Sequence, residues 1–230
     1  MSITDRVKQA RDRIAAACAR VSRSVADVHI VAVSKTQPAS AVSEAVAAGV
    51  EAIGENRVQE AAGKRPLVEG PTPWHLVGTL QRNKVKEALE LFDLIETVDR
   101  IELADRLQLQ LLPADRILPV FFEVNVGGEA QKGGVVPEGL MALAEHVASH
   151  CPQLRIAGLM TVPPYDPDPE RSRPHFAALR ELAGRLARHL GLPALELSMG
   201  MSEDFEVAIE EGATWVRLGR ILFGERRVAI

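Results

Sequence analysis

The chain has 230 residues, of which 47% are hydrophobic, and a formal net charge of −4 at pH 7. This length and apolar content are enough for one large α/β domain with a full core. A mildly acidic chain without clustered positive charge gives no reason to expect nucleic acid or an anionic membrane as a partner. No segment approaches the roughly 18 to 20 consecutive apolar residues of a membrane span, and the charged N-terminal segment lacks the apolar core of a secretory signal. We therefore expect a cytoplasmic protein.

The two cysteines, Cys18 and Cys151, lie far apart in the sequence and show no metal-ligand spacing. We expect two reduced thiols rather than a disulfide, as is usual in the cytoplasm. No metal site is expected from this spacing.

Short apolar runs alternate with helical stretches along the chain. An amphipathic helix opens it after Ser2, which forms a capping pattern with Asp5 three residues on. The expected strands are 28–33, 50–56, 74–78, 94–98, 117–127, 156–162, 195–200 and 214–219. The expected helices that follow them are 38–48, one ending near 65, 83–91, 100–111, 137–150, 170–190 and 203–210.

This alternation predicts a parallel sheet, because strands that are apolar on both faces and separated by helices are typical of one. Eight strand–helix units favour closure into a single-domain (β/α)8 TIM barrel over residues 1–230, with an extra N-terminal helix. The alternative is an open doubly wound sheet, which predicts a GxGxxG fingerprint after the first strand. The chain has SKTQP (34–38) there instead.

Lys35 is the first candidate for chemistry, because it comes directly after the first strand. The loops at the carboxyl ends of the strands form the working face of such a barrel. A lysine that is partly desolvated there loses its proton more easily, and the free amine attacks an aldehyde to form an imine. The plainer interpretation is that Lys35 pairs with Glu55 or reaches solvent.

A phosphate site is expected at the last two strand-to-helix turns, which Gly200, Gly219 and Gly224 bracket. Phosphate groups typically bind there in this fold. Ser198 would supply a hydroxyl, and the segment of Gly219 and Arg220 would supply backbone amides.

Arg217 lies in the last strand, two residues before Gly219, and is expected to face the barrel interior. A buried arginine is costly unless it meets an anion or an acceptor. Its partner would be Glu123 or Glu196 in an ion pair, or a pyridine nitrogen. If the partner is a pyridine nitrogen, that nitrogen stays unprotonated, because arginine keeps its own proton. An unprotonated pyridine ring is a weak electron sink.

Six motifs follow one another along the chain: AVSKTQP (32–38), GENRVQE (54–60), HLVGTLQRNK (75–84), NVGGEAQKGG (125–134), GLMTVPP (158–164) and a long C-terminal segment from LSMG to ILFG (197–224). Together they resemble the pyridoxal phosphate homeostasis protein family, which is related to the barrel domain of alanine racemase-type enzymes. The resemblance implies pyridoxal 5′-phosphate (PLP) as the cofactor and Lys35 as its Schiff-base lysine. It also implies that Arg217 contacts the pyridine nitrogen and that Asn56 lies beside the cofactor. The implied phosphate cradle consists of Ser198, Gly219 and Arg220.

The resemblance implies a regulator of vitamin B6 and amino-acid pools rather than an enzyme. We expect a monomer with an open rim, from which the cofactor passes to apo-PLP enzymes. The alternative is a PLP-dependent amino-acid racemase of weak activity, with His75 or Tyr165 as its second base. A Schiff-base aldolase without a cofactor is a third hypothesis, which the family signature disfavours.

Three further residues have no assigned role. His75 is most simply a hydrogen-bonded structural histidine. Lys84 either caps the following helix or faces the site, and Lys132, in a loop flanked by glycines, is most simply a solvated charge.

Overall fold

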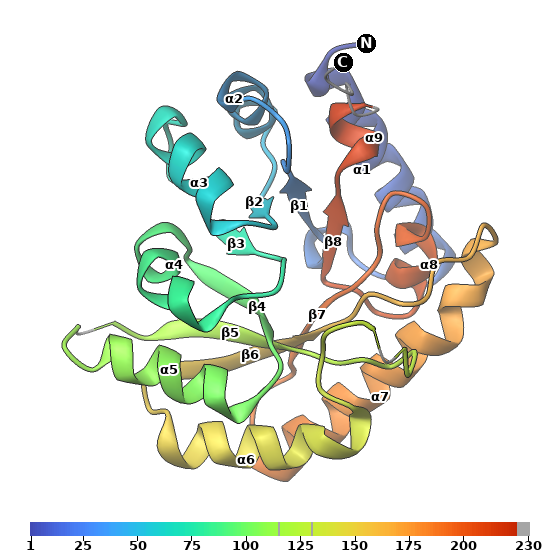
Figure 1. Cartoon of the computed structure of the whole chain (residues 1–230). Coiled ribbons are helices and arrows are strands. Elements are labelled where there is room, and N and C mark those ends of the chain that lie inside the picture. Colours follow the sequence, from blue (N-terminus) through green and yellow to red (C-terminus); the bar gives the residue numbers. More distant parts are fainter. Residues whose placement is uncertain (115, 130, 225–230) are drawn as a thin grey trace.

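The computed structural model describes residues 1–114, 116–129 and 131–224. Within these ranges, eight parallel strands close into a barrel in sequence order, with helices around the outside (Figure 1). The strands are β1 (His29–Val33), β2 (Ala52–Glu55), β3 (Trp74–Leu76), β4 (Leu94–Val98), β5 (Leu118–Glu123), β6 (Leu154–Met160), β7 (Glu196–Ser198) and β8 (Trp215–Leu218). The predicted barrel is confirmed. Residues 115, 130 and 225–230 of the predicted domain lie outside the described residues.

The helices are α1 (Ile3–Arg20), α2 (Ala39–Ala47), α3 (Val58–Lys64), α4 (Val85–Leu91), α5 (Ile101–Leu111), α6 (Leu140–His150), α7 (Arg173–Leu190), α8 (Phe205–Glu210) and α9 (Arg220–Phe223). Short 3-10 turns are η1 (Val25–Asp27), η2 (Arg65–Leu67), η3 (Arg82–Lys84), η4 (Pro137–Gly139) and η5 (Pro169–Ser172). The extra N-terminal helix begins as predicted, because the Asp5 N–H donates to Ser2 Oγ and the Ser2 N–H donates to Asp5 Oδ2, each at 3.1 Å. Among the described residues, none of the helices combines the length and the hydropathy that a bilayer-spanning segment needs.

The fifth strand is shorter than the predicted run of residues 117–127 and ends at Glu123. The chain turns at Gly128, which has a φ of +66°, and the Asn125 side chain exchanges hydrogen bonds with the Glu129 backbone. The predicted strand was too long because the alternation of apolar residues extends past Glu123 into the following loop. Local hydrogen bonds of the Asn125 side chain hold that loop in a turn.

The barrel interior divides into an apolar and a polar part. A small apolar cluster consists of Leu94, Phe121, Ala157 and Met160, against which Trp215 packs. Side chains two residues apart on a strand point to the same side. Three charged residues therefore face the same interior as this cluster, each two residues after one of its members or neighbours: Glu96 after Leu94, Glu123 after Phe121, and Arg217 after Trp215. The interior thus becomes polar toward the carboxyl ends of the strands, which is where the candidate site lies.

Both cysteines are buried and make no disulfide, as expected.

Candidate functional site

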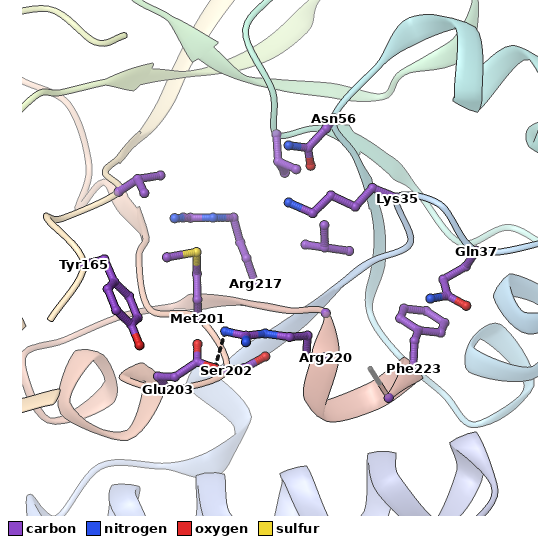
Figure 2. Close-up of a pocket in the computed structure, with 15 residues that line it drawn as sticks. Lys35, Gln37, Asn56, Tyr165, Met201, Ser202, Glu203, Arg217, Arg220 and Phe223 are labelled. Carbon is purple, nitrogen blue, oxygen red and sulfur yellow. Dashed lines mark hydrogen bonds and ion pairs between the residues drawn. The ribbon is translucent and has the colours of Figure 1, made fainter. Parts of the chain in front are cut away.

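A pocket of about 630 Å³ opens at the carboxyl ends of the strands (Figure 2). Lys35, Asn56, Arg217, Gly219 and Arg220, all expected from the sequence, line this pocket. They come from the ends of β1, β2 and β8, so residues far apart in the chain meet at one face of the barrel.

Lys35 lies in a tight turn at the end of β1. The Gln37 N–H donates to the Ser34 carbonyl oxygen at 2.9 Å, and Thr36 has a φ of 65°. A β-branched residue rarely adopts this left-handed conformation, so the turn is strained. Figure 2 shows the Lys35 side chain extending from this turn into the pocket, toward Asn56 and Arg217.

Lys64 of α3 makes polar contacts with the same turn. Its ammonium donates to the Ser34 carbonyl at 2.8 Å and to Glu55 Oε1 at 2.6 Å, and it lies 3.4 Å from Glu60 Oε2. Glu60 Oε2 also accepts the Thr36 N–H at 2.8 Å. Because only 12% of the Lys64 side chain is exposed, this is a buried ion-pair network, which stabilises the strained conformation beside Lys35.

Glu55 is fully buried in this network. Its Oε1 also accepts the Ser34 hydroxyl at 2.6 Å. Burial raises the pKa of Glu55, although the hydrogen bonds from Lys64 and Ser34 oppose the change. Glu55 was expected from the sequence as a partner for Lys35, whereas Lys64 was not predicted. The signal for Lys64 is its spacing of four residues from Glu60 on one helix.

Asn56 is positioned by the loop that follows β3. A Cβ atom at Gly78 would lie 2.3 Å from the Asn56 carbonyl oxygen and 2.8 Å from its Cα. The close approach of the two loops therefore requires glycine. Thr97 Oγ1 donates to the Gly78 carbonyl at 2.9 Å. In contrast, Lys84 does not line the pocket and pairs with Glu87 at 3.0 Å.

Arg217 is held by a polar network that crosses the barrel interior. Its Nη1 donates to Ser198 Oγ at 2.8 Å and its Nη2 donates to the Thr161 carbonyl at 2.7 Å. Ser198 Oγ donates to Glu96 Oε2 at 2.5 Å, and Glu96 Oε1 lies 2.8 Å from His75 Nδ1. Side chains from β3, β4, β7 and β8 thus fix the guanidinium at the floor of the pocket. His75 has the hydrogen-bonded structural role that was expected.

Among the described residues, the Arg217 guanidinium donates to Ser198 and Thr161 rather than to either carboxylate considered as its ion-pair partner. Glu196 accepts the indole N–H of Trp215 instead. Glu123 acts on Arg217 through its charge: burial raises the pKa of Glu123 to about 7, Asp99 adds to the increase and Arg217 opposes it. One Glu123 oxygen, Oε2, is buried without a hydrogen-bond partner among the described residues.

The prediction that Ser198 contacts phosphate does not fit its position. Ser198 is fully buried and does not line the pocket, because its hydroxyl is engaged by Glu96 and Arg217. The chain turns away at Gly200, which has a φ of +91°. The serine that lines the pocket is Ser202, whose Oγ accepts the Ile221 N–H at 3.4 Å.

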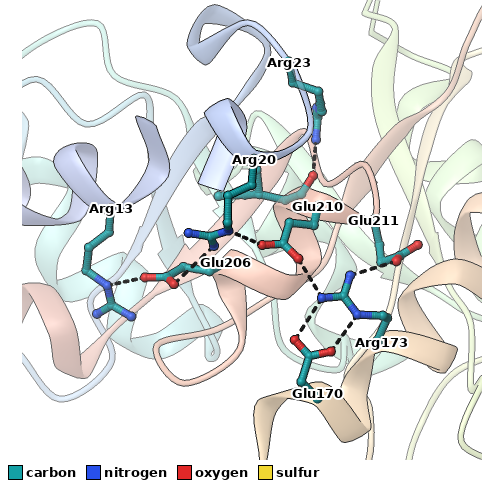
Figure 3. Close-up of polar contacts among 9 residues, drawn as sticks. Arg13, Arg20, Arg23, Glu170, Arg173, Glu206, Glu210 and Glu211 are labelled. Atoms are coloured by element: carbon teal, nitrogen blue, oxygen red, sulfur yellow. Dashed lines mark hydrogen bonds and ion pairs between the residues drawn. The ribbon is translucent and has the colours of Figure 1, made fainter. Parts of the chain in front are cut away.

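Polar contacts brace the loop that carries Ser202. Asp204 Oδ1 accepts the Met201 N–H at 2.7 Å, and α8 begins directly after Asp204. Figure 3 shows α8 tied to both neighbouring helices, since Glu210 pairs with Arg20 of α1 and with Arg173 of α7.

The rim of the pocket is charged and open. Arg220 pairs with Glu203, and their side chains are 60% and 45% exposed. Tyr165 also lines the pocket but is 79% exposed. Lys132 is not the simple solvated charge that was expected, because its Nζ donates to the Pro163 carbonyl at 2.9 Å and pairs with Glu129.

The donor set fits a small phosphorylated aldehyde with a ring nitrogen. Lys35 offers an amine, Arg217 offers a buried N–H donor, and Ser202 and Arg220 offer contacts for phosphate. Val33, Val77 and Val162 also line the pocket and supply apolar surface for a ring. A few polar groups on apolar walls, in a volume of several hundred Å³, are typical of cofactor sites.

Comparison with known proteins agrees with this chemistry. Residues 10–227 match the family model of the alanine racemase N-terminal domain. The chain is 44% identical over 228 residues to the pyridoxal phosphate homeostasis protein of Aquifex aeolicus, covering 99% of this chain and 100% of the relative. It is 47% identical over 228 residues to the protein of that name from Pseudomonas aeruginosa, covering 98% and 96%.

Among solved structures, PipY of Synechococcus elongatus with PLP bound matches with a TM-score of 0.84 and 36% identity, covering 97% of this chain and 100% of that chain. The fold, the pocket and these matches lead to one conclusion. The chain belongs to the pyridoxal phosphate homeostasis protein family.

Proposed function

We propose that this protein binds PLP covalently through Lys35 and passes it to apo-PLP enzymes, acting in vitamin B6 and amino-acid homeostasis without catalysing a reaction of its own. We further propose that it does so as a cytoplasmic monomer. One observation carries the proposal: Lys35, Arg217 and Ser202 line a single pocket. Family membership and the PLP-bound structure of PipY support it.

Each pocket residue has a distinct role in this proposal. Lys35 would hold PLP through its Nζ as a Schiff base, with loss of water from the amine and the aldehyde. Arg217 would donate a hydrogen bond to the pyridine nitrogen, and Asn56 would lie beside the ring. Ser202 donates its hydroxyl to the phosphate. Gly219 contributes backbone and Arg220 positive charge on the same side.

Arg217 also supports a carrier rather than an enzyme. When bound, PLP supplies an electrophilic carbon and a ring that withdraws electrons most strongly when its nitrogen is protonated. Arg217 cannot provide that proton, because a guanidinium keeps its own. Its contacts with Ser198 and Thr161 hold it in place, so the pocket disfavours the protonated ring.

The second candidate is a weak amino-acid racemase, because Tyr165 lines the pocket. The residue is 79% exposed at the rim, which is a poor position for a base that must contact one face of a substrate. His75 is a weaker candidate, because it is buried beneath the pocket and bonded to Glu96.

Absorption spectroscopy with borohydride trapping tests the covalent site. We expect a visible imine band when PLP is added to the wild-type protein, and a reduced adduct that peptide mapping assigns to Lys35. The band should be lost in Lys35→Ala and kept in Lys84→Ala, a lysine outside the pocket. An adduct that survives Lys35→Ala unchanged would refute the proposed site.

Transfer to an acceptor tests the carrier role. The loaded protein is mixed with an apo-PLP enzyme whose regained activity reports the arrival of the cofactor. We expect the acceptor to be activated at least as fast as PLP dissociates into solution. Failure to activate it on that timescale would refute transfer, and racemisation of alanine that depends on Tyr165 would favour the second candidate. Sedimentation of the loaded protein tests the monomer.

A further inference from the structure

Three side chains of different chemistry meet on the outside of the barrel, away from the PLP pocket. Asp105 lies on α5, His146 lies on α6, and Cys151 follows α6 directly. Figure 1 shows these two helices side by side. One ligand atom from each residue lies within 4.8 Å of the other two. We propose that this trio binds a zinc ion.

The present distances are close to those of a zinc site. His146 Nε2 lies 2.6 Å from Asp105 Oδ1, and Cys151 Sγ lies 3.9 Å from the same oxygen. Around tetrahedral zinc, with bonds of about 2.0 to 2.3 Å, neighbouring donor atoms are roughly 3.3 to 3.6 Å apart. Binding therefore requires the carboxylate and the imidazole to separate slightly and the carboxylate to move closer to the thiol.

The surface members of the trio can make this adjustment. The side chains of Asp105 and His146 are 53% and 24% exposed, so both can change rotamer without disturbing the core. Cys151 is 1% exposed and its position is set by packing. The buried thiol is thus a fixed point to which two surface ligands adapt.

The backbone beneath the trio is held by other contacts. Gln108, one turn after Asp105 on α5, donates from Nε2 to Gln153 Oε1 at 2.7 Å and accepts the Gln153 N–H at 3.0 Å. The Cys151 N–H donates to the Val147 carbonyl at 2.9 Å and closes α6. Ligands carried by such fixed backbone are placed more precisely than ligands carried by mobile loops.

The kind of ligand selects the metal. A thiol, an imidazole and a carboxylate suit zinc, whereas magnesium and calcium prefer oxygen ligands alone. Zinc would replace the thiol proton of Cys151, which is released to solvent, and would bind the neutral imidazole of His146 through Nε2. Three protein ligands leave the fourth position to water. The His150 ring stacks on that of His146 with centroids 4.6 Å apart, which helps to orient the ligand.

The sequence predicted no metal site, because the two cysteines are not spaced as metal ligands. The other ligands lie 46 and 5 residues before Cys151, on two helices that only the fold brings together. The competing interpretation is an ordinary hydrogen-bonded contact between those helices, and metal binding distinguishes the two.

Cobalt is the probe, because its spectrum reports both thiolate ligation and tetrahedral geometry. Reduced protein without PLP is titrated with Co²⁺. We expect one Co²⁺ per chain, with a thiolate-to-cobalt charge-transfer band and visible ligand-field bands that excess Zn²⁺ abolishes. The charge-transfer band should be lost in Cys151→Ser and kept in Cys18→Ser, the matched change at the other buried cysteine.

A variant of the partly exposed ligand His146 tests the site without a change to the buried Cys151. Loss of an outer-shell partner typically weakens metal binding 10- to 100-fold, so loss of a direct ligand in His146→Gln should weaken Co²⁺ binding by about 10-fold or more. His189→Gln changes a surface histidine that pairs with Glu145 on the same helix as His146, and should have no effect. Circular dichroism shows whether each variant is folded.

Absence of the charge-transfer band in the wild type, or an equal band in folded Cys151→Ser, would overturn the proposal. Because the measurement uses protein without PLP, neither outcome affects the proposed cofactor site.

Discussion

Glu123 should make the protein less stable as the pH rises toward neutrality. It ends β5, its Oε2 is buried without a hydrogen-bond partner among the described residues, and burial together with the charge of Asp99 raises its pKa to about 7. The folded protein therefore keeps a proton that the unfolded chain has already lost. We expect Glu123→Gln, which resembles the protonated form, to remove this dependence on pH.

The two pKa values give the size of the effect. The ordinary pKa of the carboxyl is 4.5 and the raised value is about 7. Between them the folded state binds more protons than the unfolded state, so stability falls as the pH rises, by about 1.4 kcal/mol per pH unit. The loss reaches about 3 kcal/mol near pH 7 and then stays constant at higher pH.

Urea denaturation of the PLP-free protein from about pH 5 to about pH 8 measures this loss. The difference in the free energy of unfolding between Glu123→Gln and wild type should grow with pH and level off above the raised pKa. Other titrating groups contribute equally to the two proteins and cancel in this difference. Glu90→Gln, at an exposed position of α4, is the control for the loss of a surface carboxylate. A difference that stays constant with pH for Glu123→Gln would show that the buried carboxyl ionises normally and would refute the reasoning.

Three further substitutions test the contacts that brace the pocket. Lys64→Met should lower the free energy of unfolding by about 3 kcal/mol in urea, because buried Glu55 loses its cation; a loss below about 1 kcal/mol would contradict this. Thr36→Gly should raise it by about 1 kcal/mol, since Thr36 has a φ of 65°, and a decrease would indicate an unstrained turn. Gly78→Ala should lower the melting temperature and weaken PLP binding, whereas Gly63→Ala, with nothing within 4 Å of the added carbon, should do neither. Equal effects of the two glycine changes would argue against the close contact.

The sequence alone was enough to predict the barrel and the main groups of the pocket. Strands that are apolar on both faces require helices on the outside, and a residue at the carboxyl end of a barrel strand must lie at its working face. Lys35 and Arg217 could therefore be placed by counting along their own strands. Strand alternation and barrel closure leave few positions for a side chain at the end of a strand.

Only the tertiary structure decided which side chains are partners. Ser198 and Ser202 are four residues apart, and the left-handed turn at Gly200 determines which hydroxyl faces Arg217 from inside the barrel and which reaches the pocket. The ion pair between Lys64 and Glu55 depends on how a helix packs against a neighbouring strand. Side-chain partners of this kind depend on loop conformation and helix packing, which involve atoms distant in sequence and leave no periodic signal along the chain.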